Sequence, residues 1–110
     1  MNFKWNEEEY KIIENFKGGN KFIKAKMTFD GKVRILDAIL PGGASIGMHK
    51  HETNFEVVFI IEGSLSVECD GVKEHLESGM VHYCPVGSTH TLINDTGSDV
   101  VIKAVIGEVK

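Results

Sequence analysis

Short runs in which apolar and polar residues alternate recur along this chain. In residues 22–29, Ala25, Met27 and Phe29 fall on one face, and Lys24 and Lys26 fall on the other. A period of two is that of a β-strand with one buried face. The run therefore predicts a strand.

Turn signals separate several runs of this kind. An Asp-Gly pair at 30–31 lies between the first strand and a second run at 33–40, and another pair at 70–71 separates runs at 65–69 and 72–76. Asp-Gly between two such runs favours the tight turn of a β-hairpin. We therefore predict two hairpins.

The rest of the chain also alternates between short predicted strands and turn sequences. Residues 41–43 (PGG) and 94–97 (NDTG) are typical turn sequences, and a last strand is expected at 100–106. Only residues 7–16 offer a short helix, and a strand at 10–13 fits the same stretch equally well. The fold class predicted is all-β, with antiparallel strands closed into a barrel or jelly roll that leaves few exposed edges.

Composition places the chain among ordinary globular domains. Its 110 residues, 42% hydrophobic and 25% charged, suffice for one domain with a single core. The net charge is -4, no basic run occurs, and Arg34 is the only arginine. Binding to nucleic acid is therefore not expected, because such proteins concentrate positive charge.

Nothing in the sequence predicts a membrane or secretory segment. The start lacks an apolar signal stretch, and the longest apolar run, at 57–61, is far too short to span a bilayer. Cys69 and Cys84 are too few for a disulfide framework, although one disulfide between them stays open. We expect a cytoplasmic protein with no membrane partner.

Candidate chemistry is concentrated around two histidines. His49 and His51 are two residues apart, so in a strand they share a face, with Cα atoms roughly 6.5–7 Å apart, and both rings can reach one metal ion. Glu56 lies five residues beyond His51, an odd offset that a straight strand would send to the opposite face. A loop at 52–54 would reset the parity, with the next strand starting near Phe55.

A third histidine stands in a similar setting. The turn sequence at 85–87 precedes His90, whose partners on the same strand face would be Leu92 and Asn94. Three neutral imidazoles and one carboxylate form a mixed nitrogen and oxygen ligand set. Such a set leaves open positions on the ion for a substrate.

The spacing of these residues resembles that of a known family, the cupins. Residues 43–63 (G-x5-H-x-H-x4-E-x6-G) match the first cupin motif, and residues 79–94 (G-x5-P-x-G-x2-H-x3-N) match the second. The spacer at 64–78 has the length found in small single-domain bacterial cupins. One departure is Met80, where many cupins carry Asp, and this is not a ligand position.

The resemblance implies a six- to eight-stranded double-stranded β-helix, or jelly-roll barrel, that forms a homodimer. Residues 1–110 would be a single cupin domain, with residues 1–20 as an N-terminal arm packing on the barrel or on a dimer partner. One divalent transition metal ion (Mn, Fe, Ni, Zn, Co or Cu) would lie inside the barrel mouth. By position, its ligands would be His49, His51, Glu56 and His90.

Candidates for acid/base catalysis are His82, Tyr83 and Glu52. In the strand around them, either His82 and Cys84 or Val81 and Tyr83 would face the cavity, and the sequence leaves both open. For Glu52 a plain loop carboxylate is the favoured interpretation, and for Cys84 a small buried core residue.

Other charged residues are interpreted as surface groups. His75 lies on the return arm of a hairpin and is expected to be solvated. The nearest candidates for binding an anionic substrate are Arg34, Lys24 and Lys26. For each of them, however, the favoured interpretation is a charged side chain on the surface of a strand.

Two functions remain open at this point. The first is a metal-dependent enzyme (isomerase, lyase or decarboxylase, or dioxygenase) that acts on a small metabolite such as a sugar, keto acid or dicarboxylate. The second is a non-catalytic metal-containing protein that binds a small ligand such as a sugar, because a fold does not fix a function. A titratable residue beside the open metal positions would favour the enzyme.

Overall fold

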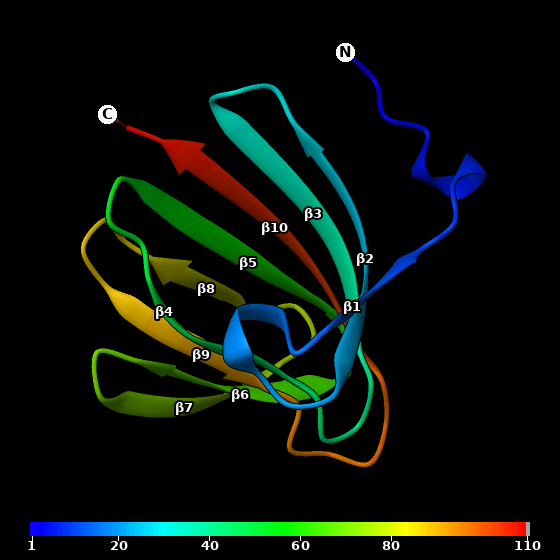
Figure 1. The fold of residues 1–110 in the computed structure, drawn as a ribbon. Helices are drawn as coiled ribbons and strands as arrows, with labels where there is room; N and C mark the ends of the chain where they lie inside the picture. Colours follow the sequence, from blue (N-terminus) through cyan, green and yellow to red (C-terminus); the bar gives the residue numbers. More distant parts are fainter. Residues whose placement is uncertain (110) are drawn as a thin grey trace.

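The computed structural model describes residues 1–109, which form two antiparallel sheets that face each other (Figure 1). The larger sheet has six strands in the order β1-β2-β3-β10-β5-β8, and the smaller has four in the order β4-β9-β6-β7. The strands are Lys11–Glu14 (β1), Phe22–Phe29 (β2), Val33–Leu40 (β3), Ser45–Lys50 (β4), Asn54–Glu62 (β5), Ser64–Cys69 (β6), Val72–Glu77 (β7), Val81–Cys84 (β8), Thr89–Ile93 (β9) and Val100–Glu108 (β10), with single-turn 3-10 helices at Trp5–Glu7 (η1) and Phe16–Gly18 (η2).

Both predicted hairpins are confirmed. β2 pairs with β3, and β6 pairs with β7, each in antiparallel register. At the second turn Asp70 and Gly71 both adopt left-handed backbone angles, with φ of 50° and 83°. A two-residue hairpin turn whose twist matches that of its strands needs this conformation, which Asp-Gly tolerates well.

The N-terminal arm forms a strand, so the helix considered for residues 7–16 is wrong. β1 pairs with β2 at the edge of the larger sheet, one residue later than the expected strand at 10–13. Ile13 packs against the core, while Ile12 is 63% exposed. That alternation is the two-residue period of a strand. With β1 included, residues 1–109 form ten strands, more than the six to eight that the resemblance implies.

The core lies between the two sheets and is apolar in its middle. Its fully buried side chains include Ile23, Leu40, Ile60, Leu65 and Ile102, which come from strands of both sheets. No helix of the described residues is long and apolar enough to cross a membrane.

The inner face of β5 changes from apolar to polar along its length. Val58 and Ile60 are buried in the core, and Glu56, on the same face nearer the start of the strand, is buried as well. This confirms the inward set predicted from Glu56. A buried carboxylate needs polar partners, and these lie at the same end of the barrel.

Candidate metal centre

The four predicted ligands meet at one end of the barrel, and they come from both sheets. His49 lies in β4 directly opposite His90 in β9, and His51 follows the end of β4. Glu56 projects from β5 of the other sheet. Residues 51–53 lie between β4 and β5 and interrupt the alternation of inward and outward side chains. Glu56 therefore points inward with the histidines despite its odd offset from His51. The sequence predicted such a loop at 52–54.

The ligand atoms of these four residues lie close together. One atom from each residue can be chosen so that all lie within 4.8 Å of one another. His90 Nε2 is 3.0 Å from His51 Nε2 and 3.2 Å from His49 Nε2. Glu56 Oε1 is 3.2 Å from His51 Nε2 and 3.0 Å from His90 Nε2. Donor atoms bound to one ion at about 2.0–2.2 Å are separated by distances of this size.

Hydrogen bonds at the far side of two rings leave their Nε2 atoms free to coordinate. His49 Nδ1 donates to Gly47 O at 2.7 Å, and His51 Nδ1 donates to Asn54 Oδ1 at 2.5 Å. Because both partners are oxygen acceptors, we assign the proton of each neutral ring to Nδ1. Each Nε2 then carries the lone pair that a metal ion needs, and the chemistry of the ligand set fits a divalent transition metal.

His82 supports the third imidazole. Its Nε2 is 2.9 Å from His90 Nδ1, and the two rings stack with centroids 5.2 Å apart. If His90 Nε2 coordinates a metal, its Nδ1–H donates to His82 Nε2. His82 therefore lies behind His90 and away from the open side of the cluster.

Glu108, in the last strand, forms a hydrogen bond with Asn54, the residue that accepts the hydrogen bond of His51. Asn54 Nδ2 donates to Glu108 Oε2 at 2.6 Å, and Thr53 Oγ1 donates to Glu108 Oε1 at 2.8 Å. The bond to Asn54 orients its side-chain oxygen, Oδ1, toward the ring of His51. Sequence reasoning missed both Asn54 and Glu108, because they are 54 residues apart and only the pairing of β5 with β10 joins them.

The electrostatics of the cluster favour coordination at neutral pH. Burial acts to raise the pKa of Glu56. In the metal-free cluster, where His51 and His90 carry protons on Nε2, their hydrogen bonds outweigh burial and hold the pKa of Glu56 at about 2, and a bound metal ion would replace those protons. The hydrogen bond to Glu56 raises the pKa of His51. Burial lowers the pKa of His49 and of His82. The carboxylate is therefore charged while His49 is neutral, the states in which both bind metal.

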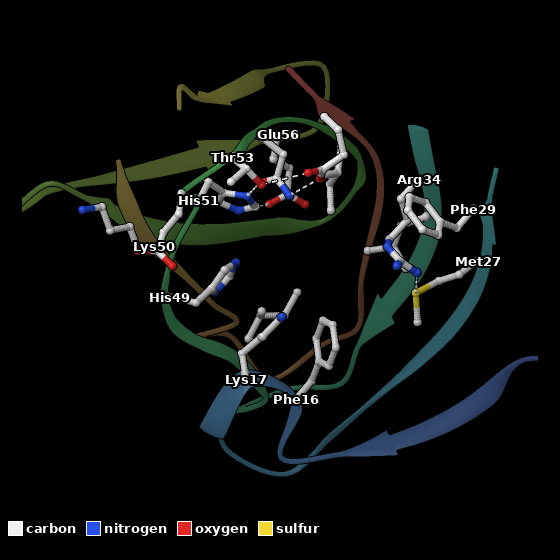
Figure 2. Close-up of a pocket in the computed structure, with 16 residues that line it drawn as sticks. Phe16, Lys17, Met27, Phe29, Arg34, His49, Lys50, His51, Thr53 and Glu56 are labelled. Carbon is white, nitrogen blue, oxygen red and sulfur yellow. Dashed lines mark hydrogen bonds and ion pairs between the residues drawn. The ribbon is translucent and has the colours of Figure 1, made fainter. Parts of the chain in front are cut away.

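A cavity of about 520 Å³ lies next to the cluster. Figure 2 shows the side chains that line it. His49, His51 and Glu56 line it, while His90 is fully buried beneath. Its remaining lining combines apolar and charged side chains: Phe16, Lys17, Met27, Phe29, Arg34, Leu36, Ile46, Lys50, Glu52, Thr53, Asn54, Ile106 and Glu108. The size lies within the usual range for small-molecule sites.

The structure decides which face of β8 points inward. Tyr83 pairs with Val57 and is 58% exposed on the outer face, with its ring 6.4 Å from that of Phe55. His82 is on the opposite, inner face, and so is the buried Cys84. The alternative in which Val81 and Tyr83 line the cavity is therefore wrong, and Tyr83 lies too far outward to reach a ligand there.

Glu52 and Arg34 both line the cavity, which changes the interpretation of Arg34. Glu52 is an exposed residue of the loop between β4 and β5. Arg34, interpreted from sequence as a strand surface charge, lies over the Phe29 ring with its guanidinium carbon 4.5 Å from the centroid. Lys17 also lines the cavity, and sequence reasoning did not single it out.

Other candidates lie outside the cavity. Lys26 Nζ donates to Trp5 O at 2.6 Å, which ties the N-terminal arm to β2. His75 is exposed on β7, as expected. Cys69 and Cys84 are free thiols, and burial raises the pKa of Cys84 to about 12, which fits a core residue better than a nucleophile.

Comparisons with known proteins agree with the fold and the motif spacing. The model of the Cupin domain family matches residues 26–106. An oxalate-binding protein of Thermotoga maritima is 30% identical over 100 residues, which cover 86% of this chain and 83% of the relative. A crystal structure of a predicted oxalate decarboxylase from Thermotoga maritima superposes with a TM-score of 0.92 at 27% identity, covering 99% of this chain and 100% of the other. KdgF from Halomonas sp. shares the fold, with a TM-score of 0.80 at 19% identity over 98% of this chain and 94% of its own.

Proposed function

The chain belongs to the cupin family, and from that premise we propose that His49, His51, Glu56 and His90 hold one divalent transition metal ion. The observation that carries this proposal is the convergence of three Nε2 atoms and one carboxylate oxygen beneath an open cavity. Mn, Fe, Ni, Zn, Co and Cu all accept mixed nitrogen and oxygen ligands of this kind.

We further propose that the cavity binds a small dicarboxylate of the oxalate class. One similar protein is named as oxalate-binding, and a similar structure is described as a predicted oxalate decarboxylase. Four protein ligands leave two positions on an octahedral ion, and the bound ion would supply the Lewis acidity that holds two ligand oxygens. Lys17 and Arg34 add positive charge to the same cavity. A dicarboxylate suits these features better than a neutral sugar does.

Turnover is a second candidate, and the position of Glu52 favours it. Its carboxyl group lines the cavity, where it can exchange a proton with a bound ligand. Decarboxylation of hydrogen oxalate would break the carbon–carbon bond, release CO₂ and place the proton on carbon to give formate. Glu52 would move that proton, and His82 would position His90.

Metal analysis tests the proposed centre. Protein stripped with a chelator and then exposed separately to Mn, Fe, Ni and Zn should take up close to one ion per chain from at least one of them. His49→Ala and His90→Ala should each lower this content, while His75→Ala, on the exposed face of β7, should leave it unchanged. No stoichiometric metal in any preparation would show that the assignment is wrong.

Calorimetric titration with oxalate tests the ligand. Metal-loaded protein should bind oxalate, and metal-free protein should not. Formate and CO₂ are then measured in the same samples. Formate production that Glu52→Gln abolishes would establish the enzyme, whereas binding without formate would establish a binding protein.

We also propose a cytoplasmic homodimer built from single domains of residues 1–110, with residues 1–20 as an arm. The support for a dimer is an apolar outer surface on β5 and β8, where Phe59, Ile61, Val81 and Tyr83 are 41–58% exposed. Burial of such a surface favours association. Light scattering coupled to size exclusion should report twice the mass of the chain.

A further inference from the structure

The N-terminal arm reaches the cavity through η2, whose backbone lies directly against that of β4. A Cβ atom added to Gly47 would lie 2.0 Å from Lys17 O, and one added to Gly19 would lie 2.0 Å from Ser45 O. Such an approach requires glycine at both positions. The contact fixes the backbone of Lys17 at the edge of the cavity.

Lys17 itself has an unusual backbone conformation. Its φ of 56° and ψ of 28° fall in the left-handed region, which glycine and asparagine occupy more readily than lysine does. The neighbouring Asn15 and Gly18 are left-handed too, and these are the residue types expected there. A lysine held in this region is a strained choice, and strain of this kind concentrates at functional sites.

The side chain of Lys17 points into the cavity that His49, His51 and Glu56 also line, and its ammonium group has no acidic partner among residues 1–109. Figure 2 shows the side chain rising from η2 into the cavity. Gly47, which touches the Lys17 backbone, also accepts the hydrogen bond of His49 Nδ1. Among residues 1–109, no carboxylate lies within ion-pair distance of Lys17 Nζ.

The neighbouring cations are differently placed. Arg34 is stacked on the Phe29 ring, and its Nη1 is 3.9 Å from Met27 Sδ. Lys21 Nζ donates to Gly42 O at 2.8 Å. Lys17 Nζ lies over the Phe16 ring, 5.6 Å from its centroid, and within residues 1–109 it donates no hydrogen bond to the protein. This leaves its hydrogen-bond donors for a ligand.

We infer that Lys17 is a specificity-determining residue, whose ammonium group binds the outward carboxylate oxygens of a dicarboxylate held at the metal. The inference rests on the proposed function and names the residue that would distinguish a dicarboxylate from a monocarboxylate. Acetate bound through its single carboxylate would present only a methyl group to Lys17. The loss of Lys17 should therefore weaken oxalate binding and leave acetate binding unchanged.

The test compares four metal-loaded proteins by calorimetric titration with oxalate and with acetate. These are the wild type, Lys17→Gln, Lys17→Gly and Lys11→Gln, the last an exposed lysine of the same arm outside the cavity. Both Lys17 variants should keep one metal per chain and raise the dissociation constant for oxalate by about 10-fold or more, the range expected for losing a charged hydrogen bond. Lys11→Gln should match the wild type.

The glycine variant separates a binding role from a structural one. Because glycine adopts a φ of 56° without strain, Lys17→Gly should unfold in urea at the same midpoint or a higher one. Unchanged oxalate affinity in both Lys17 variants, or an equal loss in Lys11→Gln, would overturn the inference while leaving the proposed function intact. Failure of the metal-loaded wild type to bind oxalate would overturn both.

Discussion

At the scale of single residues, the site depends on the hydrogen-bond partner of the Nδ1 atom in each of the three histidine ligands. Gly47 O, Asn54 Oδ1 and His82 Nε2 each bond to the Nδ1 atom of a different histidine. The partner fixes both the orientation and the tautomer, so Nε2 faces the common centre. Partners of this kind commonly account for 10- to 100-fold in metal affinity.

Asn54 provides the sharpest test of this idea. Asn54→Ala removes the acceptor of His51 Nδ1, so the affinity for metal should fall by about 10- to 100-fold. The control is Thr53→Val, which removes the other donor to Glu108 but touches no ring. Competition with a chromogenic chelator measures both. Equal losses in the two variants would contradict a role for the ring contact.

Metal binding should also weaken as the pH falls. The pKa of His51 is raised above its ordinary value of 6.5, so protons compete with the ion for this ring from about neutrality downward. The pKa of Glu56 is about 2, so that ligand stays charged throughout. Competition with a chelator at several pH values between 8 and 5 should show that the affinity for metal falls as the pH falls. An affinity that does not change over this range would contradict this assignment.

At the scale of elements, one motif residue maintains a turn and binds no metal. Asn94 is fully buried, and its Nδ2 donates to Leu40 O at 2.8 Å and to Ser98 O at 2.7 Å. Its Oδ1 accepts hydrogen bonds from the backbone and the hydroxyl of Thr96. All of its hydrogen-bonding capacity is therefore used to join the turn after β9 to the end of β3.

Replacing Asn94 should reduce stability without affecting the metal. Asn94→Ala leaves two carbonyl groups and two donors without their partner, so the free energy of unfolding should fall by about 2–4 kcal/mol. Asn20→Ala, at an exposed position, should change it by less than about 0.5 kcal/mol. Urea unfolding measures both values, and metal content should remain close to one per chain. A metal loss in folded Asn94→Ala protein would contradict the structural role.

At the scale of the whole molecule, the cluster connects the two sheets. His49 and His90 belong to strands of the smaller sheet, and Glu56 belongs to the larger one. A bound ion would therefore resist separation of the two sheets. Anything that binds only the folded state stabilises it by mass action, by about 4 kcal/mol at a thousand times the dissociation constant.

Removal of the metal should lower the thermal midpoint by several degrees. A chelator titration followed by differential scanning fluorimetry measures the shift. His75→Ala should show the same shift as the wild type, whereas His49→Ala should start near the midpoint of the stripped protein. A midpoint that is unaffected by stripping in the wild type would contradict a metal that joins the sheets.

Local patterns in the sequence were sufficient to predict most of the strands and both hairpins, because alternation with a period of two and Asp-Gly turns report local backbone geometry. The ligand set of His49, His51, Glu56 and His90 extends over residues 49–90, and it was predicted from spacing that resembles the two cupin motifs.

Only the tertiary structure decided what surrounds the cluster. The inward orientation of His82 depends on the register of β8 with β5, and the Asn54–Glu108 bond depends on the pairing of β5 with β10. The position of Lys17 depends on the packing of η2 against β4. Each involves paired or touching residues more than 20 positions apart in the sequence, and no local period specifies which segments meet.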